Sequence, residues 1–175
     1  MDRVTARHSY CVWLFSKLIE ERQTEIEGYG EFTKDDISRI AESTLLGAAY
    51  VQQCRDRALW IWRSYHAQHE EWEKQLKNAR GTWREKLLKR EPRKPFRDGL
   101  TKKIPIRIDA RTGTVEASKR IKLSPHVLRL SSLRKGVRIT VPLNPAKYHL
   151  EFLRKGRVVD FQLVKQGGKY CAHIC

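Results

Sequence analysis

The chain has 175 residues, enough for one medium-sized domain or two small ones, and its 36 lysine and arginine residues against 20 acidic residues give a formal net charge of +16. No apolar run approaches the roughly 20 residues that span a bilayer, and Met1–Phe15 lacks the long apolar core of a signal peptide, which argues against a membrane or secreted protein. The four cysteines are scattered, so we expect reduced thiols in a cytoplasmic protein that could associate with the nucleoid.

The charge is distributed unevenly along the chain. Residues 1–54 carry six basic and nine acidic residues, net −3, whereas residues 55–175 carry thirty basic and eleven acidic residues, net +19. Such asymmetry indicates a polyanionic partner, because clustered cations attract a phosphate backbone or an anionic surface. With no membrane span in the sequence, this favours RNA or DNA.

Helical spacing of apolar residues predicts a first helix over Tyr10–Glu27, ended by Gly28. Thr33 stands three residues before Asp36 and predicts the capped start of a second helix. After a short break near Thr44–Gly47, the chain continues in a long helical stretch.

That stretch runs to Arg90 without a proline, and its apolar residues recur at steps of three and four. A straight helix of roughly 45 residues would be roughly 65 Å long, so we expect it to project from a small domain or to break near Asn78–Gly81. Its predicted apolar seam contains Val51, Cys54, Ala58, Ile61, Tyr65, Trp72, Ala79, Trp83 and Leu87.

Cations surround this seam and continue into the next segment, and we predict that they contact phosphates. Trp60 and Trp62 lie among them and are candidates for stacking on bases. The alternative is a solvated face on a helical hairpin with the tryptophans in its core. The phosphate-binding candidates are Arg55, Arg63, Lys77, Arg80, Arg84, Lys86, Arg90, Arg93 and Lys94.

Two prolines, Pro92 and Pro95, stop the helix and mark a basic linker over residues 91–103. Ile104, Ile106 and Ile108 then alternate with polar or proline residues, as in a half-buried strand. We therefore expect an α+β fold, with an N-terminal helical bundle (1–90) that contains the long basic helix, followed by a small antiparallel β-barrel (104–175). Further strands are predicted over Thr114–Leu123, Leu128–Leu130, Val137–Val141, Tyr148–Leu153, Val158–Val164 and Lys169–Ile174, the fourth pairing with the fifth.

The predicted strands are joined by turns that combine glycine with cations, where the backbone could approach a phosphate closely. An ordinary hairpin with a lysine on its exposed turn is the alternative for each. The cationic set of this half comprises Lys119, Arg120, Lys122, Arg134, Lys135 and Lys155.

No pattern of a known catalytic site is found, and the carboxylates of the second half are scattered, so we expect neither an enzyme nor a cofactor. The Cys171-x-His173-x-Cys175 pattern would supply at most three metal ligands, and His66 and His69 lie far from it in sequence. We therefore predict no metal site.

The order of motifs in residues 45–175 resembles TnpB/OrfB proteins, the transposon-encoded RNA-guided DNA endonucleases. Val51-Gln-Gln-Cys-Arg-Asp-Arg-Ala58 and Arg63-Ser-Tyr65 look like their recognition helices, and Lys94-Pro95-Phe96 fits their linker. The segment just before their nuclease domain is matched by Val137-Arg-Ile-Thr-Val-Pro-Leu143, Tyr148-His-Leu-Glu-Phe-Leu153, Lys155-Gly156, Val158–Val164 and Gly168-Lys-Tyr-Cys-Ala-His-Ile174.

The resemblance implies that residues 1–90 correspond to the helical recognition lobe and residues 104–175 to the wedge β-barrel, which bind guide RNA and target DNA in that family. The family's catalytic carboxylates lie in a RuvC-like domain that would follow Cys175. We therefore expect a truncated, TnpB-like nucleic-acid-binding protein without its own catalytic domain. The alternatives are the recognition subunit of a split endonuclease whose RuvC-like part is a separate chain, and a basic structural module of a larger assembly.

Overall fold

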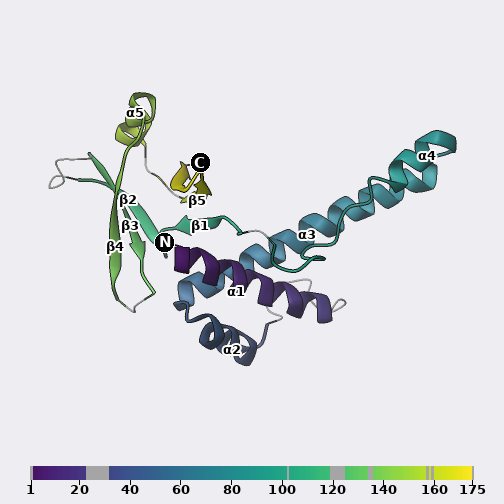
Figure 1. The fold of residues 1–175 in the computed structure, drawn as a ribbon, viewed down its shortest axis with the longest axis horizontal. Coiled ribbons are helices and arrows are strands. Elements are labelled where there is room, and N and C mark those ends of the chain that lie inside the picture. Colours follow the sequence, from purple (N-terminus) through teal and green to yellow (C-terminus); the bar gives the residue numbers. More distant parts are fainter. Residues whose placement is uncertain are drawn as a thin grey trace.

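A computed structural model describes residues 2–22, 32–101, 103–118, 125–133, 136–156, 158 and 160–174. Four helices come first and two small antiparallel sheets follow, with a fifth helix between strands (Figure 1), which confirms the α+β class and the N-terminal helical region. The helices are α1 (Asp2–Glu21), α2 (Lys34–Thr44), α3 (Ala48–Asn78), α4 (Gly81–Leu88) and α5 (Lys147–Lys155).

Helix α1 begins eight residues before the predicted start at Tyr10. Its first turns are buried through Thr5, His8 and Ser9 as well as Val4, so polar residues occupy positions where the sequence pattern requires apolar ones. Ser9 satisfies its hydroxyl by donating to the carbonyl of Thr5 at 2.9 Å and by accepting from the amide of Ile104 at 2.9 Å. The predicted helix end near Gly28 lies outside the described residues.

The predicted capped start of α2 is confirmed. The Asp36 amide donates to the Thr33 hydroxyl at 3.1 Å, and the Thr33 amide donates to the Asp36 carboxylate at 3.0 Å. The guanidinium of Arg22 donates two hydrogen bonds to the same carboxylate, at 2.9 and 3.0 Å. This pairing lowers the pKa of Asp36 to about 2. Leu45, in the left-handed conformation at φ 53°, ends α2 and makes the expected break before α3.

Helix α3 has 31 residues, about 46 Å at 1.5 Å per residue, and only its first half is buried, against α1 and α2. The second half projects from the body as an arm (Figure 1). The predicted break after Asn78 is confirmed, and α4 folds back on the arm, where the indole of Trp72 donates to the carbonyl of Leu87 at 2.8 Å.

The strands form two three-stranded antiparallel sheets, in the orders β1-β5-β6 and β2-β3-β4. The predicted strand over Tyr148–Leu153 is wrong, because these residues lie in α5, and β5 pairs instead with β1 and β6. In so short a segment, alternation is hard to tell from helical spacing, since Tyr148 and Phe152 are also one helical turn apart. The strands are β1 (Ile106–Asp109), β2 (Gly113–Ala117), β3 (His126–Ser131), β4 (Arg138–Leu143), β5 (Asp160–Gln166) and β6 (Lys169–Ile174).

One hydrophobic core joins the helices to the sheets. Ile106 and Ile108 of β1 are fully buried, as their alternation predicts, and belong to the same buried cluster as Phe15 of α1 and Val51 of α3. The hydroxyl of Tyr50 also donates to the carbonyl of Ser131, at 2.9 Å, so α3 is tied to β3. The base of the arm is therefore held by both halves of the chain.

Gly113 opens β2 at a place with no room for a side chain. A Cβ there would lie 2.6 Å from Cγ2 of Ile108 and 2.8 Å from the carbonyl oxygen of Arg129. We expect Gly113→Ala to lower the free energy of unfolding by about 1–3 kcal/mol, because backbone and core would have to shift, and urea denaturation would measure this. Gly47→Ala is the control, since a Cβ at Gly47 meets nothing within 4 Å. Equal effects of the two changes would contradict the close approach at Gly113.

Candidate nucleic-acid interface

Positive charge is concentrated on α4 and the linker rather than on α3. Residues 48–78 carry five basic and four acidic residues, whereas residues 79–103 carry ten basic and three acidic residues. No ion pair joins the cations of α4 to a carboxylate in the part of the chain that the structure describes, so their charge is uncompensated. The exposed predicted residues of this segment are Arg80, Arg84, Lys86, Arg90 and Arg93.

The predicted cations of α3 are placed differently from one another. Arg63 and Lys77 are exposed, Lys77 on the projecting half, whereas Arg55 is half-buried and donates to the carboxylate of Asp56 at 3.1 Å. Lys94 of the linker is paired with Glu20 of α1 at 3.0 Å. The structure thus places Lys77 and the candidates of α4 on the arm, and leaves Arg55, Arg93 and Lys94 near its base.

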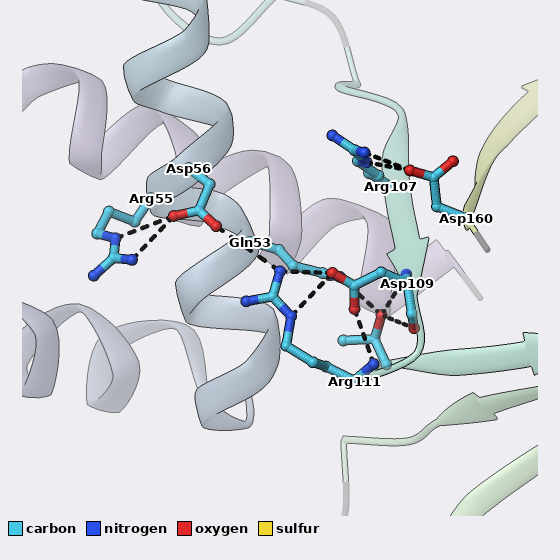
Figure 2. Close-up of polar contacts among 8 residues, drawn as sticks. Gln53, Arg55, Asp56, Arg107, Asp109, Arg111 and Asp160 are labelled. Atoms are coloured by element: carbon cyan, nitrogen blue, oxygen red, sulfur yellow. Dashed lines mark hydrogen bonds and ion pairs between the residues drawn. The ribbon is translucent and has the colours of Figure 1, made fainter. Parts of the chain in front are cut away.

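A polar junction fixes the base of the arm against the sheets (Figure 2). Arg111, in the turn after β1, lies between Asp109 at 2.6 Å and Asp56 of α3 at 3.9 Å. Gln53 of α3 donates to the buried hydroxyl of Thr112 at 3.0 Å. Burial opposes ionisation of Asp109, but the hydrogen bonds from Arg111 and Gln53 outweigh it and hold its pKa below the usual value. The junction therefore sets the direction in which the arm projects.

Trp62 and Trp83 do not lie as predicted, whereas Trp60 is exposed. Trp62 is 3% exposed and contacts Tyr65 edge-to-face at 5.8 Å, so its proposed stacking on bases is wrong: it lies on the α3 face that covers the core. Trp60 is 56% exposed, with the guanidinium of Arg57 4.3 Å from its ring centre. Trp83, predicted in the apolar seam, is instead 49% exposed at the arm tip, because Leu87 of the same helix makes the buried contact. Trp60 and Trp83 are therefore the exposed indoles of this region.

Helix α5 presents an aromatic pair that the sequence reasoning missed. Tyr148 and Phe152 are 70% and 61% exposed, and their ring centres are 5.0 Å apart. Lys155, a predicted phosphate contact, is exposed at the end of the same helix. The four-residue spacing of Tyr148 and Phe152 could have indicated this pair, because residues four apart lie on the same face of a helix. It has this meaning only if the segment is assumed to be helical. The other predicted cations of this half, Lys119, Arg120, Lys122, Arg134 and Lys135, lie outside the described residues.

His8 is buried beneath the base of the arm. Burial, and secondarily the positive charge of Arg57, lowers its pKa from 6.5 to about 4. Between pH 6.5 and 4, His8 is protonated in the unfolded chain but stays neutral in the folded chain. The free energy of unfolding should therefore fall as the pH drops from 6.5 to 4, by ~3 kcal/mol in total. Denaturation at several pH values would measure the slope.

His8→Gln removes the titrating group and is expected to flatten this slope. The paired carboxylate of Asp36 should not interfere, since its pKa is lowered from 3.8 to about 2 and its stabilising contribution is lost only below pH 3.8. An unchanged slope in the variant would show that His8 takes up its proton in the folded state.

No family model, curated protein or solved structure matches this chain. Among the helices of the described ranges, none combines the length and the apolar character needed to cross a membrane. The described histidines, cysteines and carboxylates form no group of three that could hold a metal ion, and Cys11, Cys54 and Cys171 are free thiols.

Proposed function

We propose that this chain is a nucleic-acid-binding protein whose main contact surface is the basic segment of residues 79–103, on α4 and the linker. The observation that carries the proposal is the excess of positive charge in this segment, ten basic against three acidic residues, together with the position of α4 on an arm that projects from the body. Uncompensated cations on such an arm would neutralise phosphates and release counterions, which supplies affinity without sequence readout.

Exposed aromatic rings, one of them among these cations, support folded or single-stranded RNA over duplex DNA. Bases that are not stacked in a duplex can stack on an indole, a contact worth roughly 1–3 kcal/mol per base. Trp83 stands at the arm tip, and Tyr148 and Phe152 form a second exposed aromatic surface on α5. We give the stacking role to these three rings and to Trp60, a candidate from the sequence that is exposed, but not to the buried Trp62.

The resemblance to TnpB-type proteins makes the proposed partner more specific. In this proposal the helices and the sheets bind a guide-like RNA, and DNA beside it, while the chain itself performs no cleavage. If a separate RuvC-like chain exists, this protein would act as the recognition subunit of a split endonuclease.

A salt titration of the full chain tests the binding proposal. Affinity for a structured RNA, a single-stranded DNA and a duplex DNA should be measured by fluorescence anisotropy between 50 and 200 mM salt. With six to ten phosphate contacts we expect affinity to fall roughly a thousandfold or more over this range. Tight binding that ignores salt, or no binding to any of the three probes, would contradict the proposal.

Incubation with labelled RNA and DNA in Mg²⁺ or Mn²⁺ tests the absence of catalysis. We expect intact substrates, because three of the four carboxylates of residues 104–175 are paired with arginines, Asp109 with Arg111, Glu116 with Arg129 and Asp160 with Arg107, which leaves only Glu151 on α5. Cleavage that follows the protein through repurification would overturn this part of the proposal.

A further inference from the structure

A pocket of about 600 Å³ lies where the linker returns along the base of α3 toward β1. This volume is within the range of small-molecule sites. We call it the linker pocket, and its lining combines cations with apolar side chains, among them Arg57, Ile61, Arg93, Phe96, Arg97 and Lys103.

Two cations of the linker pocket are paired with carboxylates of α1. Lys94 contacts Glu20 at 3.0 Å, and Lys103 contacts Asp2 at 3.6 Å. Both ion pairs join the linker to α1 and hold the pocket wall in place. They also neutralise part of the positive charge of Lys94 and Lys103.

Three arginines of the pocket have no such partner. No carboxylate of the described residues forms an ion pair with Arg57, Arg93 or Arg97, and Asp98 is the single acid among the pocket's lining residues. Arginine guanidinium groups bind phosphate with two parallel hydrogen bonds, so three of them around one cavity suit a phosphate group.

Arg57 is the most constrained of the three. Its Nε atom is buried and has no hydrogen-bond partner among the described residues. Burial, together with the positive charge of Arg107, lowers its pKa. A buried donor without an acceptor is costly, and an anion in the pocket would offset the positive charge of this half-buried side chain.

Phe96 gives the pocket an apolar wall at a position of backbone strain. Its φ of 56° is left-handed, which is rare for a bulky residue, and its half-buried side chain packs against the core. Such strain persists where the surroundings hold it and is concentrated at ligand-binding sites. Ile61 of α3 adds a second apolar surface to the same cavity.

We propose that the linker pocket binds a nucleotide, with its phosphate on Arg57, Arg93 and Arg97 and its sugar or base against Ile61 and Phe96. Inorganic phosphate would satisfy the cations but leave the apolar wall unused. The nucleotide could be free or part of a bound strand, and the second case rests on the function proposed above.

The test compares AMP, inorganic pyrophosphate and a 12-nucleotide single-stranded RNA as probes of the full chain. The pocket variant Arg93→Ala/Arg97→Ala removes two exposed cations without a described carboxylate partner, and the control Arg3→Ala/Lys34→Ala removes the same charge from exposed positions on α1 and α2, outside the pocket. We expect the pocket variant to weaken AMP binding, measured by calorimetry, about tenfold or more, and the control to change it less than twofold.

The outcomes separate the two sources of the nucleotide and the two proposals. AMP binding that is tighter than pyrophosphate binding and depends on the pocket supports a free-nucleotide site, even if the RNA does not bind and the proposed function fails. If AMP does not bind, ultraviolet cross-links from the RNA to residues 93–103 that disappear in the pocket variant support a nucleotide of a strand. The pocket proposal is overturned if the pocket variant and the control bind AMP and RNA with equal affinity. It is also overturned if pyrophosphate binds as tightly as AMP. In either case RNA binding by the arm stands.

Discussion

Replacing Arg80, Arg84 and Arg90 by alanine is expected to lower the affinity for structured RNA about 100- to 500-fold at 0.1 M salt. Each phosphate contact contributes about 0.7 to 0.9 to the slope of log affinity against log salt, so three lost contacts should flatten that slope by about 2 to 2.7. All three side chains are exposed, on or beside α4. The measurement is an anisotropy titration of wild-type and variant protein at four or more salt concentrations.

A matched control removes three exposed cations that lie outside the arm. Arg3→Ala, Lys34→Ala and Arg39→Ala lie on α1 and α2, away from the arm. Both triple variants change the net charge equally, so a general field effect would weaken binding in both. If the two variants lose the same affinity, the arm is not the contact surface.

Phe161→Ala is expected to lower the free energy of unfolding by about 3–5 kcal/mol and to destabilise the helices together with the sheets. Phe161 lies on β5, is 1% exposed, and belongs to the cluster that also contains Phe15 of α1. Loss of a buried phenyl ring removes apolar burial and leaves a cavity. Because the core is shared, the helical signal at 222 nm should melt at a midpoint shifted down by roughly 10 °C, although the substitution lies in a strand.

Phe152→Ala makes the same chemical change on the surface. Phe152 is 61% exposed on α5, so its loss should change the free energy of unfolding by less than about 0.5 kcal/mol. A helical signal that keeps its wild-type midpoint in Phe161→Ala would contradict the shared core and would favour two domains that unfold separately.

Local patterns were enough to predict several elements. The structure confirms three of them: the helix cap formed by Thr33 and Asp36, the helix break near Asn78, and the buried alternation of Ile104, Ile106 and Ile108. Each depends on neighbours within a few residues, through a cap, an interrupted helix or a two-residue period. Sequence alone could therefore find them.

The errors arose where burial depends on contacts distant in sequence. Trp62 lies outside the predicted apolar seam and Trp83 within it, but the first faces the core and the second the solvent. The spacing of apolar residues in the α5 segment fits both a strand and a helix, so the sequence alone did not distinguish them. The structure shows a helix with no buried residue.

Composition and spacing by themselves determined the fold class, the order of helices before strands and the excess of positive charge in residues 55–175, because these follow from residue type and local periodicity. Tertiary structure alone decided that the cations of α4 lie on a projecting arm, that both halves share one core, and that the linker folds back so that Arg57, Arg93 and Arg97 line one pocket. These depend on how α1 packs against α3 and on how Arg111 and Gln53 tie α3 to the sheets, contacts between residues far apart in sequence that no local pattern encodes.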